Sequence, residues 1–325
     1  MTHPLVETAA NPTPQDARVD TLPLKSGKEL RYAIFPATTH PVQGTVVILQ
    51  GRNECIEKYF ETVRDITKRG FTVAAFDWRG QGGSSRMLRD PARGHIRSFD
   101  HYASDLELLF ESVLLPDCRG PFYVLAHSTG ALVALLAAPA LANRIRRLVL
   151  MAPLLDVNGG RLGKMLLSAV ANTLRSTGLG RVYIRGGKPV TKPFAINEVT
   201  SDAARYVRNN EIFKAAPELA IGGATAGWIA SAAKAIRRVT EPDYIEAIRI
   251  PTLVVAAGAD RIVSTPAIER FALQLRNATL ITIDGARHEI LQEKDFYREQ
   301  FFAAFDAFIP GTGGDMTESE NEQAT

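Results

Sequence analysis

The sequence predicts an α/β protein built on a mostly parallel, doubly wound sheet. Short apolar runs alternate along the chain with longer segments whose apolar residues recur at helical spacing, the order typical of strand–helix–strand units. The apolar runs are continuous rather than alternating, as in parallel strands buried on both faces. One long interval has no such run, which predicts a helical insertion into this pattern.

The expected strands are each followed by turn-forming residues. In chain order they are GTVVILQ (44–50), FTVAAFD (71–77), FYVLAH (122–127), RLVLMAP (147–153), PTLVVAAG (251–258) and ATLITIDG (278–285). The helical patterns between and after them cover 55–69, 101–115, 129–142, 265–276 and 292–308. Ligands of such sheets bind at the carboxyl ends of the strands, so we expect the functional residues in the loops that follow these runs.

The domain organisation follows from where the pattern stops. Residues 17–153 and 246–310 form the expected α/β core, and residues 154–245 form the expected helical cap insertion. This interval of roughly 90 residues is too long for a loop in a compact domain. The polar ends of the chain are expected to be disordered, as an N-terminus over 1–16 and an acidic tail over 311–325.

Composition excludes several classes of protein. The net charge of +3 over 325 residues is too small to indicate nucleic-acid binding. Cys55 and Cys118 lack the spacing of a metal site, which favours a reduced, cytoplasmic chain. The first residues lack a signal-peptide pattern, and no uncharged apolar stretch approaches the ~18 residues of a membrane span. No G-x-G-x-x-G motif follows the first strand, so no cofactor is expected.

Ser128 is the candidate nucleophile. The segment AHSTG around it nearly matches G-x-S-x-G, with Ala126 in place of the first glycine. An apolar run precedes Ser128 and a helical pattern follows it, which is the strand–turn–helix setting of a nucleophile elbow. Small residues at Ala126 and Gly130 would let the strand and the helix approach closely. Ser176 also begins an STG segment, but no strand precedes it; the competing interpretation of Ser128 is a helix cap.

A serine nucleophile needs a base, and the base needs an orienting acid. His288 follows the last expected strand, so it lies at the carboxyl edge of the sheet and is the candidate base. Asp260 lies just past the preceding strand, at the same edge, and is the candidate acid. Asp156 is the rival, because it lies a few residues past its own strand.

The tetrahedral intermediate of an acyl transfer also needs hydrogen-bond donors. The backbone N–H of Thr129, directly after the serine, is one candidate, and the N–H of Arg52 in the loop LQGRNECIEKY is the other. The side chain of Arg52 either has a separate role in the site or is an ordinary surface charge, and the sequence favours neither alternative.

Taken together, these segments resemble the α/β-hydrolase family of lysophospholipases and monoacylglycerol lipases. QGRNECIEKY is similar to the family's H-G-x-x-E-…-Y segment, with Gln50 in place of histidine, and DWRGQGGSS is similar to D-x-R-G-H-G-x-S, with Gln81 in place of histidine. AHSTG stands for G-H-S-x-G, and PTLVVAAGADRIV and GARHE look like the acid and base segments. The resemblance implies an α/β-hydrolase fold and hydrolysis of monoacyl lipids through an acyl-enzyme, without metal or cofactor.

The insertion carries an unusual distribution of charge. Between residues 161 and 197 every charged residue is basic, and leucine, valine and methionine residues lie between them. Such a segment either contacts an anionic membrane surface or packs on its own domain with solvated charges. Peripheral membrane association of a cytoplasmic enzyme is therefore one of two expectations.

The function expected from the sequence is that of a serine esterase acting on a lysophospholipid or a monoacylglycerol. The alternatives are a peptidase or thioesterase that uses the same triad, and a non-catalytic binding protein with this fold. The intact order of serine, aspartate and histidine argues against the non-catalytic alternative.

Overall fold

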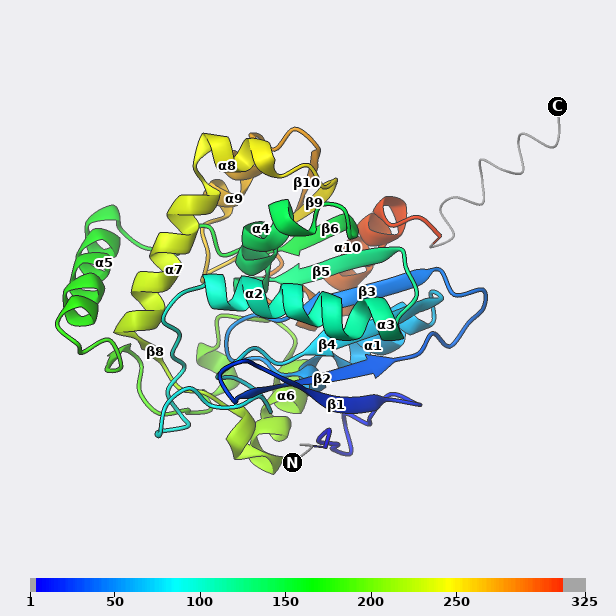
Figure 1. Cartoon of the computed structure of the whole chain (residues 1–325), viewed down its shortest axis with the longest axis horizontal. Coiled ribbons are helices and arrows are strands. Elements are labelled where there is room, and N and C mark those ends of the chain that lie inside the picture. Colours follow the sequence, from blue (N-terminus) through cyan, green and yellow to red (C-terminus); the bar gives the residue numbers. More distant parts are fainter. Residues whose placement is uncertain (1–3, 312–325) are drawn as a thin grey trace.

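The computed structural model describes residues 4–311. Its centre is an eight-stranded sheet with the strand order β1-β2-β4-β3-β5-β6-β9-β10, in which β2 runs antiparallel to its neighbours and the strands from β4 to β10 are parallel (Figure 1). The strands are β1 Arg18–Pro23, β2 Glu29–Phe35, β3 Gly44–Leu49, β4 Phe71–Phe76, β5 Phe122–His127, β6 Ile145–Met151, β9 Thr252–Ala257 and β10 Ala278–Ile283.

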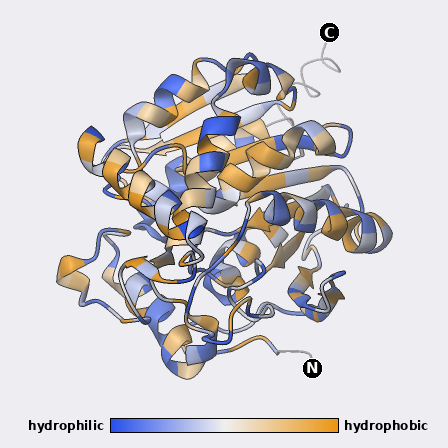
Figure 2. Ribbon diagram, turned by 60° about the vertical axis from the view of Figure 1, so that its left-hand side comes forward, coloured by the Kyte–Doolittle hydropathy of each residue, from blue (hydrophilic) through white to orange (hydrophobic). Residues whose placement is uncertain are grey.

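Helices cover both faces of this sheet. They are α1 Phe60–Thr67, α2 Asp100–Leu109, α3 Leu115–Asp117, α4 Thr129–Leu141, α9 Thr265–Ala272 and α10 Asp295–Phe308. Residues of α1 and α10 share one hydrophobic cluster, and residues of α2, α4 and α9 share the other. In β3, Val46 and Ile48 belong to the first cluster while Val47 and Leu49 belong to the second, because successive side chains of a strand point to opposite faces. Along their turns the helices in Figure 2 alternate between hydrophobic and hydrophilic colours, as helices with one buried face do.

All six strands expected from continuous apolar runs are present, within one or two residues at most ends. The two strands at the antiparallel edge, β1 and β2, were not expected. Side chains of β1 alternate between partly buried and exposed along most of its length, so its sequence contains no continuous apolar run. The helix expected over 101–115 begins at Asp100, passes through a π-turn at Phe110–Leu114 and ends as α3.

The interval between β6 and β9 is mainly helical. It contains α5 Arg161–Ser176, α6 Ala203–Ala215, α7 Ala226–Val239 and α8 Pro242–Ala247, together with the short antiparallel pair β7 Tyr183–Arg185 and β8 Ala224–Thr225. Helix α7 packs against both α4 and α5, and α5 and α7 lie side by side at the left of the sheet in Figure 1. Within residues 4–311, no helix combines the length and the apolar character needed to cross a bilayer.

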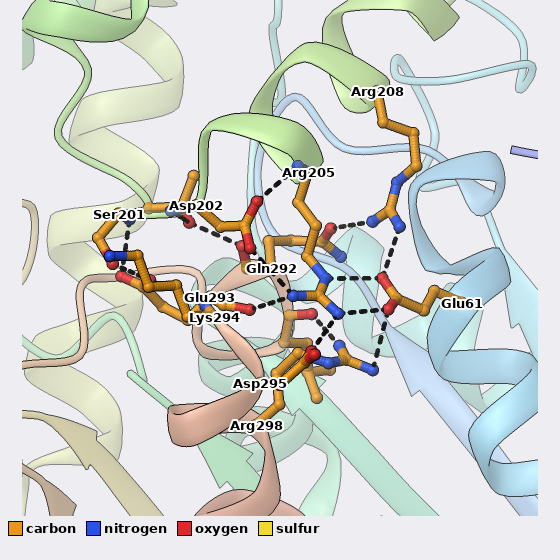
Figure 3. A network of polar contacts seen from close by, with 12 residues as sticks. Glu61, Ser201, Asp202, Arg205, Arg208, Gln292, Glu293, Lys294, Asp295 and Arg298 are labelled. Carbon is orange, nitrogen blue, oxygen red and sulfur yellow. Dashed lines mark hydrogen bonds and ion pairs between the residues drawn. The ribbon is translucent and has the colours of Figure 1, made fainter. Parts of the chain in front are cut away.

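Helix α6 is held to the core by an ion network around Glu61 of α1 (Figure 3). Arg205 donates from Nε and Nη2 to the two carboxylate oxygens of Glu61, at 2.9 and 2.6 Å, and Arg208 donates to Glu61 at 2.5 Å. Although burial alone would raise it, the pKa of Glu61 falls to about 2 because of these guanidinium groups. This part of the insertion is therefore fixed to the core beside the carboxyl edge of the sheet.

The expectation that residues 1–16 are disordered needs correction for residues 4–16, which lie on the core. Asn11 is buried and donates to the carbonyl oxygen of Glu57 at 2.8 Å, and the N–H of Val6 donates to the Glu57 carboxylate at 3.2 Å. A polar segment is ordered here because the core offers partners for its backbone and amide groups. The expected acidic tail lies outside the described residues, apart from Gly311.

Candidate active site

Ser128 occupies the sharp turn between β5 and α4. Its φ of 52° lies in the left-handed region, which is a strained conformation for a residue with a side chain. The turn is tight because β5 and α4 lie against the end of β3: a Cβ atom at Gly130 would overlap the carbonyl oxygen of Leu49. This is the geometry of a nucleophile elbow, and it explains why a small residue is needed at position 130.

His288 and Asp260 form a hydrogen-bonded chain with this serine. His288 Nε2 lies 3.0 Å from Ser128 Oγ, and His288 Nδ1 lies 2.7 Å from Asp260 Oδ2. Only 7% of the Ser128 surface and 5% of the His288 surface are exposed, so the chain is shielded from water. The three residues lie far apart in the sequence and meet because β5, β9 and β10 end at the same edge of the sheet.

The carboxylate of Asp260 is oriented by two backbone donors. Its Oδ1 accepts hydrogen bonds from the N–H groups of Ile262 and Val263, at 2.7 and 2.9 Å. Burial opposes the ionised form, but the hydrogen bond from His288 and these two N–H groups lower the pKa of Asp260. Asp260 is thus an ionised carboxylate at neutral pH, which is the form that holds an imidazole with its proton on Nδ1.

Asp156, the rival acid, has other partners. Its Oδ2 accepts a hydrogen bond from Lys164 Nζ at 2.5 Å, and its Oδ1 accepts one from the N–H of Val157. The structure therefore brings Asp260, and not Asp156, to His288.

The two candidate oxyanion donors follow the carboxyl ends of neighbouring strands. In the parallel pair β3–β5, Leu49 is opposite Ala126. Arg52 lies in the loop after β3, and Thr129 lies in the turn after β5. Thr129 is the first residue of α4, and the helix itself supplies no acceptor for its N–H.

A buried ion cluster lies behind His288, the candidate base. His127 Nδ1 lies 3.2 Å from Glu54 Oε2, and His127 Nε2 lies 3.1 Å from the carbonyl oxygen of His288. Both partners only accept hydrogen bonds, so these two contacts favour the protonated ring, which donates from both nitrogens. Burial opposes this charge, but the Glu54 carboxylate raises the pKa of His127. The cluster thereby holds the backbone of His288 in place.

Lys58 completes this cluster. Its Nζ donates to Glu54 at 2.9 Å and to Glu289, the neighbour of His288, at 2.6 Å. Burial alone would raise the pKa of Glu54, but Lys58 and His127 hold it well below its usual range. The sequence contained only a weak signal for this arrangement, the spacing of four residues between Glu54 and Lys58.

The two glutamines that replace motif histidines are buried and hydrogen-bonded. Gln50 Nε2 donates to the carbonyl oxygen of Phe76 at 2.7 Å and to Asp77 Oδ1 at 2.9 Å. Gln81 Oε1 accepts from the N–H of Asn53 at 2.7 Å. These contacts tie the loop after β3, which carries Arg52, to the loop after β4.

A cavity of about 670 Å³ lies between the core and the insertion, and Ser128, Asp260 and His288 are not among its lining residues. Its core wall includes Asn53, Ile262 and Glu289, which are close neighbours of Arg52, Asp260 and His288 in the chain. Residues of the insertion complete the wall, among them Lys188, Lys192 and Tyr206. Within the described residues, no group of three or more histidine, cysteine or acidic side chains is placed to hold a metal ion.

Comparison with known proteins decides the family. Residues 40–295 match the hydrolase family described as serine aminopeptidase, S33. The chain belongs to this family. Lysophospholipase L2 of Escherichia coli (strain K12) is 32% identical over 290 residues, which are 86% of this chain and 82% of that protein. Probable lysophospholipase L2 of Haemophilus influenzae is 30% identical over 281 residues, 86% of this chain and 87% of that protein.

The fold is shared with solved structures of this hydrolase family's relatives. A soluble variant of monoglyceride lipase from Saccharomyces cerevisiae, in complex with a substrate analog, matches with a TM-score of 0.73 and 20% identity, and the match covers 91% of this chain and 96% of that one. The predicted α/β-hydrolase fold and the predicted family resemblance are both confirmed. The hydrogen-bonded residues Ser128, His288 and Asp260 are consistent with membership of a hydrolase family.

Proposed function

We propose that this member of the hydrolase family is a serine esterase that cleaves monoacyl lipids. The observation that carries the proposal is the hydrogen-bonded chain from Ser128 through His288 to Asp260 at the end of the sheet. The similarity to two bacterial lysophospholipases supports a lysophospholipid as the substrate, and the similarity to the yeast monoglyceride lipase supports a monoacylglycerol.

In the proposed mechanism, His288 Nε2 removes the proton from Ser128 Oγ as the oxygen attacks the ester carbonyl. The N–H groups of Arg52 and Thr129 donate to the oxyanion, and Asp260 stabilises the imidazolium. His288 then gives its proton to the leaving alcohol, and an acyl-enzyme remains. A water molecule, activated by the same histidine, releases the fatty acid. Each step uses a group of the chain itself.

Residues 154–245 act as a cap in this proposal. Because Ser128 is almost fully enclosed, a substrate whose ester reaches it must bring its acyl chain into the protein. Each buried methylene contributes roughly 0.8 kcal/mol, or about a factor of four in affinity. We therefore expect kcat/KM to rise with acyl length and to level off once the available space is full.

This prediction is tested with monoacyl esters of increasing chain length, a matched diacyl lipid and an aminoacyl amide. The diacyl lipid should be a poor substrate, since its second chain must also leave water. The amide tests the aminopeptidase activity that the family description mentions. A response that is flat or falling with chain length, or a preference for the amide, contradicts the lipid assignment and favours a peptidase.

Peripheral contact with an anionic membrane is the second part of the proposal. Helix α5 exposes Leu162, Met165 and Leu166 on one face, with 75%, 60% and 64% of their surfaces accessible. These residues recur at helical spacing, and the same segment carries basic residues without acids. An exposed apolar face flanked by basic side chains is typical of a helix that lies in a lipid interface.

We expect binding to anionic vesicles to weaken as salt is raised, because surface charges are screened within about 8 Å at physiological ionic strength. Replacing Arg175 and Arg181 with glutamine should weaken vesicle binding. The matched control replaces Arg249 and Arg276, two exposed arginines that precede β9 and β10 at the amino ends of these strands. This replacement should leave vesicle binding unchanged. Equal binding of the wild-type protein to neutral and anionic vesicles would rule out the electrostatic contribution.

A further inference from the structure

The guanidinium of Arg52 lies between the core and the insertion without a carboxylate partner among residues 4–311. Its Nη2 donates to the carbonyl oxygen of Gly222 at 2.6 Å, and its Cζ lies 5.2 Å from the ring centre of Trp228. Its Nε is buried and has no hydrogen-bond acceptor among the described residues. A guanidinium has five N–H groups, so this environment leaves most of its hydrogen-bonding capacity unused.

Two other buried or largely buried arginines are paired with acids. Arg31 contacts Glu57 and Asp77, and Arg205 contacts Glu61. For Arg52, burial without such a partner lowers the pKa to about 10. The group is still protonated at neutral pH, so the protein keeps an uncompensated cation in a desolvated place. Burying such a cation is unfavourable in free energy unless a ligand supplies the opposite charge.

The surroundings of Arg52 leave room for its guanidinium between the core and the insertion. A Cβ atom at Gly94 would lie 2.6 Å from Arg52 Nη2, so the absence of a side chain there leaves room for the group. Asn53, the next residue, lines the cavity between the core and the insertion, as does Ala220, which is two residues from the carbonyl group that Arg52 contacts. The guanidinium therefore lies next to two segments that line this cavity.

The reach of the side chain matches that of a substrate. In a 1-acyl lysophospholipid, the ester carbonyl carbon and the phosphorus are separated by as many covalent bonds as separate the backbone nitrogen of Arg52 from its guanidinium carbon. If the backbone N–H faces the ester carbonyl, the guanidinium has the length needed to meet the phosphate. Arginine also suits this partner, because its planar fork binds a phosphate through two N–H groups.

We propose that the guanidinium of Arg52 binds the phosphodiester of a lysophospholipid while the backbone N–H of the same residue faces the ester carbonyl. This inference rests on the proposed esterase function and narrows it to substrates that carry a phosphodiester. A monoacylglycerol offers no charge to Arg52 and leaves the cation uncompensated.

The test compares two substrates with the same palmitoyl chain, 1-palmitoyl-lysophosphatidylcholine and 1-palmitoylglycerol. Arg52→Met keeps the backbone N–H and much of the side-chain length, so any disturbance of the oxyanion site affects both substrates and cancels in their ratio. A hydrogen bond to a charged group is worth about ten- to a hundredfold in rate or affinity. We expect Arg52→Met to lower the ratio of kcat/KM, phospholipid over glycerol ester, by that factor, and Arg52→Lys to lower it less.

Arg93 supplies a matched control. It also stacks on an aromatic ring, that of Tyr183, and donates to a carbonyl group of the insertion, but it is paired with Asp90. Arg93→Met should leave the substrate ratio unchanged. An unchanged ratio in Arg52→Met, even with both activities reduced, overturns the proposal and makes Arg52 a tether of the insertion. An equal fall of the ratio in Arg93→Met also overturns it.

Two further measurements separate the remaining outcomes. A 1-alkyl ether lysophospholipid cannot be hydrolysed at this position, so its binding to wild type and Arg52→Met tests the anion site even if wild type cleaves neither ester, the result that would contradict the proposed function. Weaker binding by the variant supports the proposal. If Arg52→Met instead relieves inhibition by palmitate without changing the substrate ratio, Arg52 binds the released carboxylate, and the phosphodiester assignment is wrong.

Discussion

Replacing Ser128 with alanine is expected to lower the rate of ester hydrolysis about a million-fold, the loss that other serine hydrolases show when triad function is removed. The reason is chemical: the variant has no oxygen at the end of β5 that His288 can deprotonate. The fold should be unaffected, because within residues 4–311 the side chain of Ser128 makes a hydrogen bond only to His288. Turnover of a short-chain ester and the thermal unfolding of both proteins measure the two effects.

Ser176 provides the control for this substitution. It is also followed by threonine and glycine, but it lies in the last turn of α5 and its Oγ donates to the carbonyl oxygen of Thr173 at 2.9 Å. Ser176→Ala should therefore retain full activity. Substantial hydrolysis by well-folded Ser128→Ala would mean that another group is the nucleophile.

The second large effect is expected for Asp260→Asn, which should lower turnover about 10⁴-fold, as the equivalent change does in a serine protease triad. An asparagine at this position is neutral and cannot stabilise the imidazolium. Its amide can also donate to Nδ1, which favours the tautomer with the proton on Nε2, the nitrogen that must accept the serine proton. The steady-state kcat of a soluble ester is the measurement.

Asp156→Asn is the matched comparison. Its carboxylate pairs with Lys164, and we expect only a mild change in kcat when it is neutralised. If the two aspartates showed the reverse order of severity, the acid of the triad would have to be Asp156, and the distance between Asp260 and His288 would have no catalytic meaning.

Much of the core could be predicted because its strands are buried on both faces. β3, β5 and β9 are fully buried along their length, so their sequences are continuously apolar and stand out from the helices. The edge strand β1 is mostly half-buried or exposed, and nothing in its composition separates it from a loop. The N-terminal segment was misjudged for a related reason: its order depends on partners such as Glu57, which are remote in the sequence.

The candidate site could also be predicted only in part. Ser128, Asp260 and His288 could be proposed because each directly follows a recognisable strand, and the structure brings them within hydrogen-bonding distance; their catalytic roles stay predictions. The contacts of His127 could not be foreseen, since they involve two acceptors from distant segments of the chain. The role of the Arg52 side chain was equally undecided, because only the folded insertion shows that it lies against Trp228 and has no carboxylate partner among residues 4–311.

The central claim is that Ser128 is an activated nucleophile, and labelling with a fluorophosphonate tests it most directly. The reagent reacts with serines that a neighbouring base activates, and peptide mass spectrometry locates the adduct. We predict a single adduct on Ser128, slower labelling in Asp260→Asn and none in Ser128→Ala. Absence of labelling in the wild-type protein, under conditions in which a control serine hydrolase is labelled, or an adduct on another residue, would contradict the account.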